Sequence, residues 1–165
     1  MGKLVQARLL ELFVDNDGQL VRRVAKGKAP AGAVCEGRTN NGYYRVRVDG
    51  VYQLVHRVLW TMRHGDIPTE LLVDHRDGNG YNNSIDNLRL ATHGQNMQNA
   101  ITHTGNTSGH RGVHWSVAAG KWQVQCNANG RNHYGGLFVD YSAACAAADT
   151  MRLTLHGKFA GGNYR

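Results

Sequence analysis

The segment from residue 71 to residue 101 constrains the fold of this chain most strongly. It predicts an apolar strand, a polar loop rich in Gly and Asn, a second apolar strand and a helix, over residues 71–73, 74–83, 88–91 and 93–101. Thr92 with Gln95 three residues later resembles a capping box, which supports the start of the helix. The centre of the chain is therefore expected to fold as strand, loop, strand, helix.

Two titratable residues, Asp74 and His75, follow the first of these strands. Neighbours in a regular strand point to opposite faces, so we expect the strand to end at this pair if both side chains serve one site. His75 is the natural candidate for a base near neutral pH in this unit. Asp74 offers a carboxylate oxygen and Asn96 an amide oxygen, donors that suit Mg²⁺ or Mn²⁺ better than zinc. Asn87 is expected to reach back and fix the imidazole tautomer.

This set of groups indicates hydrolysis of a phosphodiester bond. The reaction needs a base for the attacking water, charge stabilisation at phosphorus and help for the departing oxyanion. Asp, Asn and Gly also cluster in ordinary turns, and turn formation is the better explanation for Gly78, Asn79 and Asn82. For His56, contact with a phosphate and a packed or capping position at a helix start remain open alternatives.

The region before the central unit predicts further regular elements. Residues 3–11 suit a short helix, while apolar segments on both sides of an Asp-Asn-Asp-Gly turn suit a hairpin, and both remain open. Residues 44–48 alternate strictly before an Asp-Gly turn and residues 51–55, which predicts a β-hairpin. Residues 56–64 place apolar residues on one helical face, and Gly65 ends that helix.

The region after the central unit predicts a separate module. Residues 102–110 have the composition of a linker. Three strands over residues 112–117, 121–127 and 133–138 precede a helix over residues 141–156, with Asp140 or Ser142 as its cap and Gly157 as its stop. Such a sheet covers one face with the helix and exposes the other. The expected division is residues 1–101 with a core at about 71–101, the linker 102–110, and residues 111–165.

Charge favours a polyanionic partner. Nineteen Lys and Arg against twelve Asp and Glu give a formal net charge of +7. Arg57, Arg76 and Arg89 are expected either to bind backbone phosphates or to form a solvated basic face. The three widely spaced cysteines suit reduced thiols, and no signal peptide or transmembrane run is apparent, so a cytoplasmic protein without membrane attachment is expected.

The central motif resembles the HNH endonuclease family, most closely its phage and intron-associated homing branch. The resemblance rests on residues 73–79, the Asn82–Asn83 pair, residues 86–89 and Asn96. It implies a ββα-metal finger in an α+β fold, in the cytoplasm of the host cell if the chain is encoded by a bacteriophage. It also implies that His75 is the general base supported by Asn87, and that Asp74 and Asn96 hold one divalent ion, Mg²⁺ or Mn²⁺, with no zinc expected.

The C-terminal region resembles the AP2 DNA-binding domain over residues 107–165. The resemblance implies a three-stranded antiparallel sheet packed on one helix, with the exposed sheet in the major groove of DNA. Trp115 is expected to be mostly a packing residue, whereas Trp122 is evenly divided between the core and DNA. The DNA contacts implied are Arg111, His114, Ser116, Lys121, Trp122, Gln123, Gln125, Arg131 and Tyr134.

These patterns together predict a metal-dependent DNA endonuclease of the homing type. It would bind double-stranded DNA and nick one strand per active site, whether as a monomer or as a homodimer. The alternative is a noncatalytic, sequence-specific DNA-binding regulator that keeps the finger only as a fold. An RNA-directed nuclease or binder is a third possibility.

Overall fold

The computed structural model describes residues 4–99 and 106–161, and it is a mixed α and β chain. Two compact units make up the chain, residues 1–93 and residues 94–165. The division therefore falls after the first residue of the helix of the central motif, whereas the sequence places it in a linker at residues 102–110. Of that linker, residues 102–105 lie outside the described residues.

The N-terminal region contains both of the elements that its sequence left open. A helix, α1 (Gln6–Leu12), leads directly into a hairpin of β1 (Phe13–Asn16) and β2 (Gln19–Arg22). Asp17 and Gly18 have positive φ values of 50° and 83°. Two such residues form a tight turn whose twist matches the right-handed twist of the two strands it connects. The first residue of the predicted helix, Lys3, lies outside the described residues.

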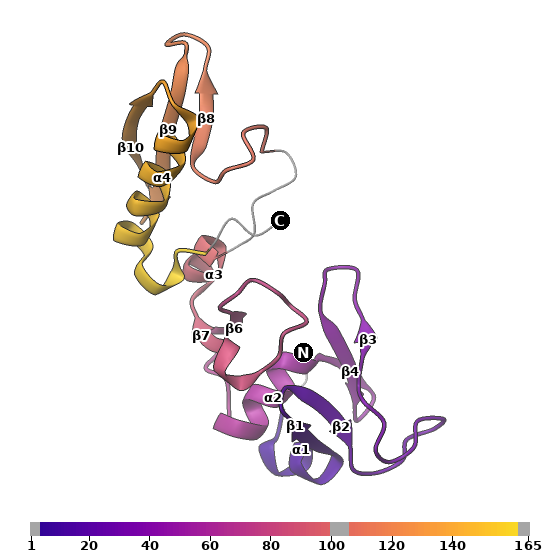
Figure 1. Cartoon of the computed structure of the whole chain (residues 1–165). Coiled ribbons are helices and arrows are strands. Elements are labelled where there is room, and N and C mark those ends of the chain that lie inside the picture. Colours follow the sequence, from indigo (N-terminus) through magenta and orange to yellow (C-terminus); the bar gives the residue numbers. More distant parts are fainter. Residues whose placement is uncertain (1–3, 100–105, 162–165) are drawn as a thin grey trace. The chain divides into compact units, whose positions relative to one another are not determined.

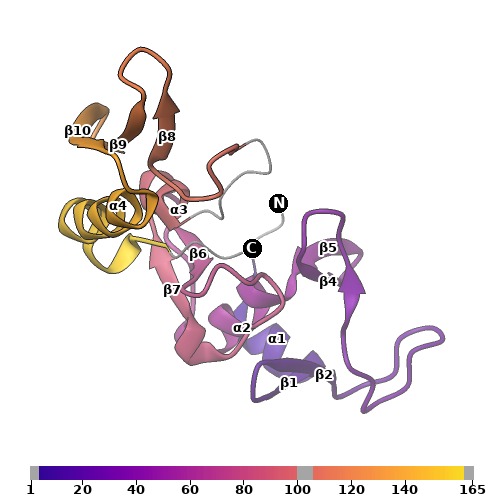
Figure 2. The same ribbon diagram turned by 45° about the horizontal axis from the view of Figure 1, so that its top comes forward.

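The predicted hairpin and helix over residues 44–64 are confirmed. The hairpin turns at Asp49 and Gly50, which have φ values of 42° and 88°, and Gly65 ends the helix with a φ of 83°. Figure 2 shows the two hairpin strands side by side. The elements are β3 (Gly37–Arg38), β4 (Tyr44–Val48), β5 (Val51–Leu54) and α2 (Val55–His64), and the sheet order is β3-β4-β5.

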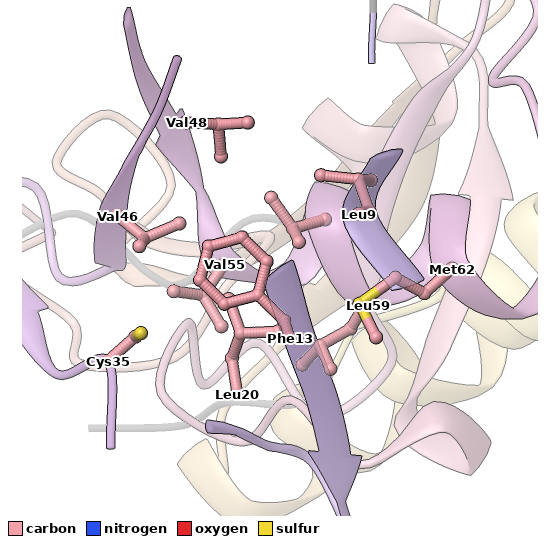
Figure 3. Packing of buried hydrophobic residues seen from close by; sticks show 10 residues of the cluster. Leu9, Phe13, Leu20, Cys35, Val46, Val48, Val55, Leu59 and Met62 are labelled. Carbon is pink, nitrogen blue, oxygen red and sulfur yellow. The ribbon is translucent and has the colours of Figure 1, made fainter. Parts of the chain in front are cut away.

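The core of the first unit lies between these helices and hairpins. Figure 3 shows the Phe13 ring at the centre of the cluster, with Val55 and Leu20 close by. The inward residues of β4 and one face of α2 complete it, as the alternating and helical patterns predict. Its members are Leu9, Phe13, Leu20, Cys35, Val46, Val48, Val55, Val58, Leu59 and Met62.

The central motif has the predicted order of elements. Antiparallel strands β6 (Leu72–His75) and β7 (Leu88–Ala91) flank a loop that ends in the short 3-10 helix η1 (Ile85–Asn87). Helix α3 (His93–Asn99) follows, and the predicted continuation to residue 101 lies outside the described residues. Gly78 has a φ of 73°, which confirms that it serves the turn after β6.

The second unit is a three-stranded antiparallel sheet with one helix along it, as Figure 1 shows. The small residues Ala144 and Ala148 are buried against Val113 and Val124, so the helix packs closely on the sheet. Asp140 caps the helix by accepting a hydrogen bond from the Ala143 N–H at 2.7 Å. The elements are β8 (Val113–Ser116), β9 (Lys121–Ala128), β10 (Arg131–Phe138), α4 (Tyr141–His156) and η2 (Gly157–Phe159), in the sheet order β10-β9-β8.

Contacts of α3 explain why all but its first residue belongs to the second unit. The Arg111 guanidinium donates to the carbonyl oxygens of Met97 and Gln98, each at 2.9 Å, at the end of this helix. A side chain added at Gly161 would lie 2.8 Å from the Asn99 Cα atom, so the C-terminal segment also passes directly against the helix. None of the helices in the described part of the chain is both long and apolar enough to span a bilayer.

Candidate active site

Strand β6 ends at His75, as expected, but both Asp74 and His75 still belong to its regular ladder. Asp74 is paired with Arg89 and His75 with Leu88 in the antiparallel ladder. The ladder extends this far because the Arg76 N–H also bonds the Asn87 carbonyl oxygen at 2.8 Å. Alternation therefore directs Asp74 and His75 to opposite faces of the two-stranded ribbon.

Asp74 forms a buried ion pair with Arg89. The Arg89 Nε–H donates to Asp74 Oδ2 at 2.8 Å, and the two side chains are 7% and 6% exposed. Arg89 was expected to bind a backbone phosphate or lie on a solvated face, and the structure instead places it in the interior. Cross-strand pairing brings the two residues together, because directly opposite residues share a face of the ribbon. Arg89 thus orients the predicted metal ligand.

His75 is buried on the other face and is held by Asn83. Its Nε2 atom lies 2.9 Å from Asn83 Oδ1, and both side chains are 4% exposed. An amide oxygen has no proton to give, so Nε2 carries the proton and donates it. In the neutral imidazole the basic lone pair is then on Nδ1. The contact thereby selects the tautomer whose lone pair is on Nδ1.

Asn87 acts on the loop and not directly on the imidazole, which corrects its expected position. Its side-chain nitrogen donates to Asp77 Oδ1 at 2.9 Å and to the Asn82 carbonyl at 2.7 Å, and its oxygen accepts from the Asp77 N–H at 3.2 Å. The Asn82 side chain donates to Asp77 Oδ2 at 2.7 Å. Asn87 therefore braces the loop that carries Asn83, and the Asn82–Asn83 pair in the sequence was the signal for the residue that contacts His75.

Asp77 is the hub of this loop. Burial raises its pKa, but hydrogen bonds from Asn82, the Asn79 N–H and Asn87 lower it more, so its pKa lies below the ordinary value. The carboxylate is therefore ionised near neutral pH and keeps the loop bonded.

Two aromatic rings enclose the imidazole of His75. His56 on α2 approaches it edge to face, with ring centroids 4.8 Å apart, and the Tyr43 ring centroid lies 5.9 Å from it. His56 is itself 4% exposed, and burial, the charge of His75 and that of Arg57 lower its pKa to about 3. His56 Nδ1 has no hydrogen-bond partner in the described part of the chain. The packed position left open for His56 by the sequence is the one found.

Two hairpins hold the loop of residues 76–87 in place. A side chain at Gly80 would lie 2.6 Å from the Tyr43 ring and closer still to the Gly42 carbonyl. A side chain at Gly18, in the turn between β1 and β2, would lie 2.6 Å from the Ser84 nitrogen. Both glycines are therefore needed for close approach, and the first unit positions the loop by packing on both sides.

The donors in this region fit a single hard cation held by few side chains. Among residues 4–99 and 106–161, no three His, Cys, Asp or Glu side chains lie together as a metal-binding group. A divalent ion held there would thus complete its coordination with amide, water or phosphate oxygens, as Mg²⁺ does. Asp74 is oriented by a hydrogen bond, as ligating carboxylates commonly are. Asn96 is partly exposed on α3 in the second unit, and its role as a ligand stays a prediction.

The strand register divides the predicted DNA contacts of the second unit between two faces. His114, Ser116, Lys121, Gln123, Gln125 and Tyr134 share the face opposite Val124, and that face is the one away from α4. Trp122 packs against the core on the helix side. Arg131 is exposed but pairs with buried Ala128, which also directs it to the helix side.

Two further residues differ from expectation. Trp115 was expected to be mostly a packing residue, but it is 48% exposed and contacts the Trp122 ring edge to face at 5.1 Å. The strand pair that contains both tryptophans extends to the end of the sheet, where the core no longer covers Trp115. Arg111 is partly buried and its guanidinium binds the carbonyls of α3, as described above. Burial lowers its pKa, as does the charge of Arg152.

Two arginines next to the site remain as candidates for phosphate contacts. Arg76 is exposed at the end of β6. Arg57 is partly buried on α2, and its Nε atom has no hydrogen-bond partner within residues 4–99 and 106–161.

Comparison with known proteins identifies the central motif. Residues 53–98 match the family model described as HNH endonuclease. The chain is 37% identical to Protein 3.8 of Escherichia phage T7 over 105 residues, 64% of this chain and 86% of that protein. It is also 32% identical to an uncharacterized HNH endonuclease of Acanthamoeba polyphaga mimivirus over 121 residues, 73% of this chain and 62% of that protein. No solved structure matches the chain. The central segment of the chain is therefore similar to an HNH endonuclease domain.

Proposed function

We propose that this chain is a metal-dependent DNA endonuclease of the homing type that nicks one strand of a duplex at each active site. The observation that carries the proposal is the buried contact between His75 Nε2 and Asn83 Oδ1, inside the segment that matches the HNH model. It leaves the basic lone pair of a neutral His75 on Nδ1, the state in which a histidine can accept a proton from water.

His75 takes a proton from a water molecule as the water oxygen forms its bond to phosphorus. The bond from phosphorus to the 3′ oxygen breaks, and the departing oxygen takes a proton from solvent. Asn83 keeps the imidazole in the Nε2–H tautomer, and the Asp77 network keeps Asn83 in place. Tyr43 and His56 limit the motion of the ring by packing around it.

Alternation directs Asp74 and His75 to opposite faces of the ribbon, but both lie at the end of β6, so we propose that the scissile phosphate spans this end. Asp74 would hold Mg²⁺ or Mn²⁺, with Asn96 as the second protein ligand suggested by the motif. Such an ion, when bound, neutralises charge on the phosphate and on the leaving oxygen. Arg89 keeps the Asp74 carboxylate in one orientation through its 2.8 Å hydrogen bond. We expect both Arg89→Gln and Asp74→Asn to raise the Mg²⁺ concentration needed for half-maximal nicking. The increase should be smaller for Arg89→Gln, because only Asp74 supplies a ligand atom.

The second unit is proposed to grip duplex DNA through the face of its sheet away from α4, as an AP2-like module would. The support is the register, which gathers His114, Gln123, Gln125 and Tyr134 on one exposed surface. These side chains donate and accept hydrogen bonds at base edges in the major groove, while Lys121 contacts a phosphate.

A plasmid-nicking assay tests the proposed function. Wild-type protein is expected to convert supercoiled plasmid to the open circle in Mg²⁺ and not in EDTA. His75→Ala is expected to lower the nicking rate at least 100-fold, on the scale of a lost general base, while DNA affinity measured in EDTA changes by less than twofold. His64→Ala, an exposed histidine on α2, is the matched control and should nick at the wild-type rate.

The same assay separates the proposal from its alternatives. A wild-type protein that binds a specific duplex tightly but never nicks it in Mg²⁺ or Mn²⁺ would be a noncatalytic regulator. Equal loss of nicking and binding in His75→Ala would show that His75 is structural. Preference for RNA over DNA of the same sequence would point to an RNA-directed protein, because the narrow major groove of RNA excludes a sheet.

A further inference from the structure

The sheet β3-β4-β5 carries arginines on the face away from the core. Val46 and Val48 of β4 are buried, and Arg45 and Arg47 alternate with them on the exposed side. Tyr52 of β5 is paired directly opposite Arg47 and is 57% exposed. Alternate residues on one face of a strand are about 7 Å apart. The side chains of Arg45 and Arg47 therefore leave the strand side by side on the same face.

A cavity of about 390 Å³ lies beside this sheet, and residues from both of its faces line it, among them Arg45 and Val46. Four arginines and one carboxylate, Glu36, line it, so the charged side chains of the lining sum to +3. None of the four arginines takes part in an ion pair within the described residues. We call the five lining residues Arg22, Arg38, Arg45, Arg47 and Tyr52 the arginine face; Arg45, Arg47 and Tyr52 lie on the side of the sheet away from the core, whereas Arg38 is paired with Tyr44 on the other side and Arg22 comes from β2. Glu36 offsets one of the four positive charges, so a net positive charge remains.

Aromatic rings and one backbone contact orient these arginines. The Arg45 guanidinium lies 4.6 Å and that of Arg47 lies 5.8 Å from the Tyr52 ring centroid. Arg47 Nε also donates to the Gly50 carbonyl at 2.8 Å, which leaves its terminal nitrogens for another acceptor. Because the groups are already restrained, an anion that binds them costs less side-chain entropy.

We propose that the arginine face binds the backbone phosphates of duplex DNA beside the bond that is cut. Guanidinium groups match phosphate oxygens in a two-point geometry, and a row of them follows a chain of phosphates better than a single small anion. Contacts from guanidinium groups to phosphates position the duplex and do not specify its sequence.

Arg38, which lines the same cavity, contacts the loop that holds His75 from the side of the sheet that carries Tyr44. The Arg38 guanidinium lies 5.5 Å from the ring centroid of Tyr81 in that loop, and Tyr44 of β4 lies 4.8 Å from the same ring. These contacts all belong to the first unit. A duplex held on the arginine face is therefore held by the unit that carries the base, and the inference rests in this respect on the proposed nuclease function.

Salt-dependent DNA binding tests the inference. Affinity for a 40-base-pair duplex is measured in EDTA at several salt concentrations for wild type, Arg45→Gln, Arg47→Gln and the double variant. Each lost phosphate contact is expected to reduce the slope of log affinity against log salt by about 1, and hence by about 2 in the double variant, equally for unrelated sequences. Arg63→Gln, an exposed arginine on α2 outside the arginine face, is the matched control. Far-UV circular dichroism confirms that each variant is folded.

The outcomes are distinct from those of the nicking assay. A double variant with the wild-type slope, or one whose slope changes no more than that of Arg63→Gln, would overturn the arginine face as a DNA site even if the wild type nicks plasmid. Loss of affinity for duplex RNA without loss for duplex DNA would overturn it as well. A slope reduced by about 2 supports it, even for a protein that fails to nick.

Discussion

The buried histidine beside the proposed base makes the stability of the first unit depend on pH. His56 is 4% exposed, and its folded-state pKa is lowered to about 3 by burial, His75 and Arg57. In the unfolded chain a histidine has a pKa of about 6.5. Between these values the unfolded chain binds a proton that the folded chain does not, so the free energy of unfolding rises with pH in this window. The contribution is complete above about pH 6.5 and is lost progressively as the pH falls toward 3.

The magnitude follows from the two pKa values. At pH 5, protonation of the unfolded histidine lowers the free energy of unfolding by about 2 kcal/mol relative to pH 7. Replacement by phenylalanine keeps a ring between Tyr43 and His75 but removes the titrating group. We therefore expect the change in unfolding free energy between pH 7 and pH 5 to be about 2 kcal/mol smaller in His56→Phe than in the wild type.

Urea unfolding followed by tryptophan fluorescence measures this difference. Trp60 is the tryptophan of the first unit, and a Trp115→Phe, Trp122→Phe background removes the signal of the second unit. Val58→Ala is the matched control, because Val58 is buried on the same helix but does not titrate. It should lower stability at both pH values and leave their difference unchanged. A His56→Phe variant with the full wild-type pH dependence would refute the buried, neutral state of His56.

Three further changes test the packing of the two units. Arg89→Met should lower the unfolding free energy of the first unit by about 3–5 kcal/mol, because the charge of Asp74 stays in the interior, and Asp74→Leu added to it should recover most of the loss in the same fluorescence assay. Gly80→Ala should cost about 1–3 kcal/mol and slow nicking, since the new methyl group overlaps the Tyr43 ring; wild-type rates and stability would contradict the close approach. Asp140→Ala should cost the second unit about 1 kcal/mol through loss of its helix cap, measured by Trp122 fluorescence, with the exposed Ser142→Ala as control.

Local chemistry in the sequence was sufficient for most of the elements and for the resemblance to an HNH endonuclease. Strict alternation and an Asp-Gly turn predicted the β4–β5 hairpin, and the small-residue helix with Asp140 and Gly157 at its ends predicted α4 to the residue. Such features depend on backbone sterics and hydrogen bonds within a few residues, so they can be predicted without knowledge of the fold. The Asp74–His75 motif with its following asparagines likewise predicted the resemblance to the HNH family.

Tertiary structure decided which side chains meet. Cross-strand register buried Arg89 against Asp74, although its sequence position suggested a surface phosphate contact. Loop packing gave His75 the contact with Asn83, eight residues away, where Asn87 was expected. Strand register and the packing of segments distant in the chain determine which side chains become partners. The residue type alone does not tell whether an arginine is buried or exposed.

The arginine face shows the same division. Alternation in β4 placed Arg45 and Arg47 opposite the core, which the sequence by itself determined. That Arg22 and Arg38 join them around one cavity, and that Tyr81 links them to the loop of His75, required three separate segments to converge. Whether these segments meet depends on the free energy of packing the whole first unit, and that free energy cannot be predicted from a local sequence pattern.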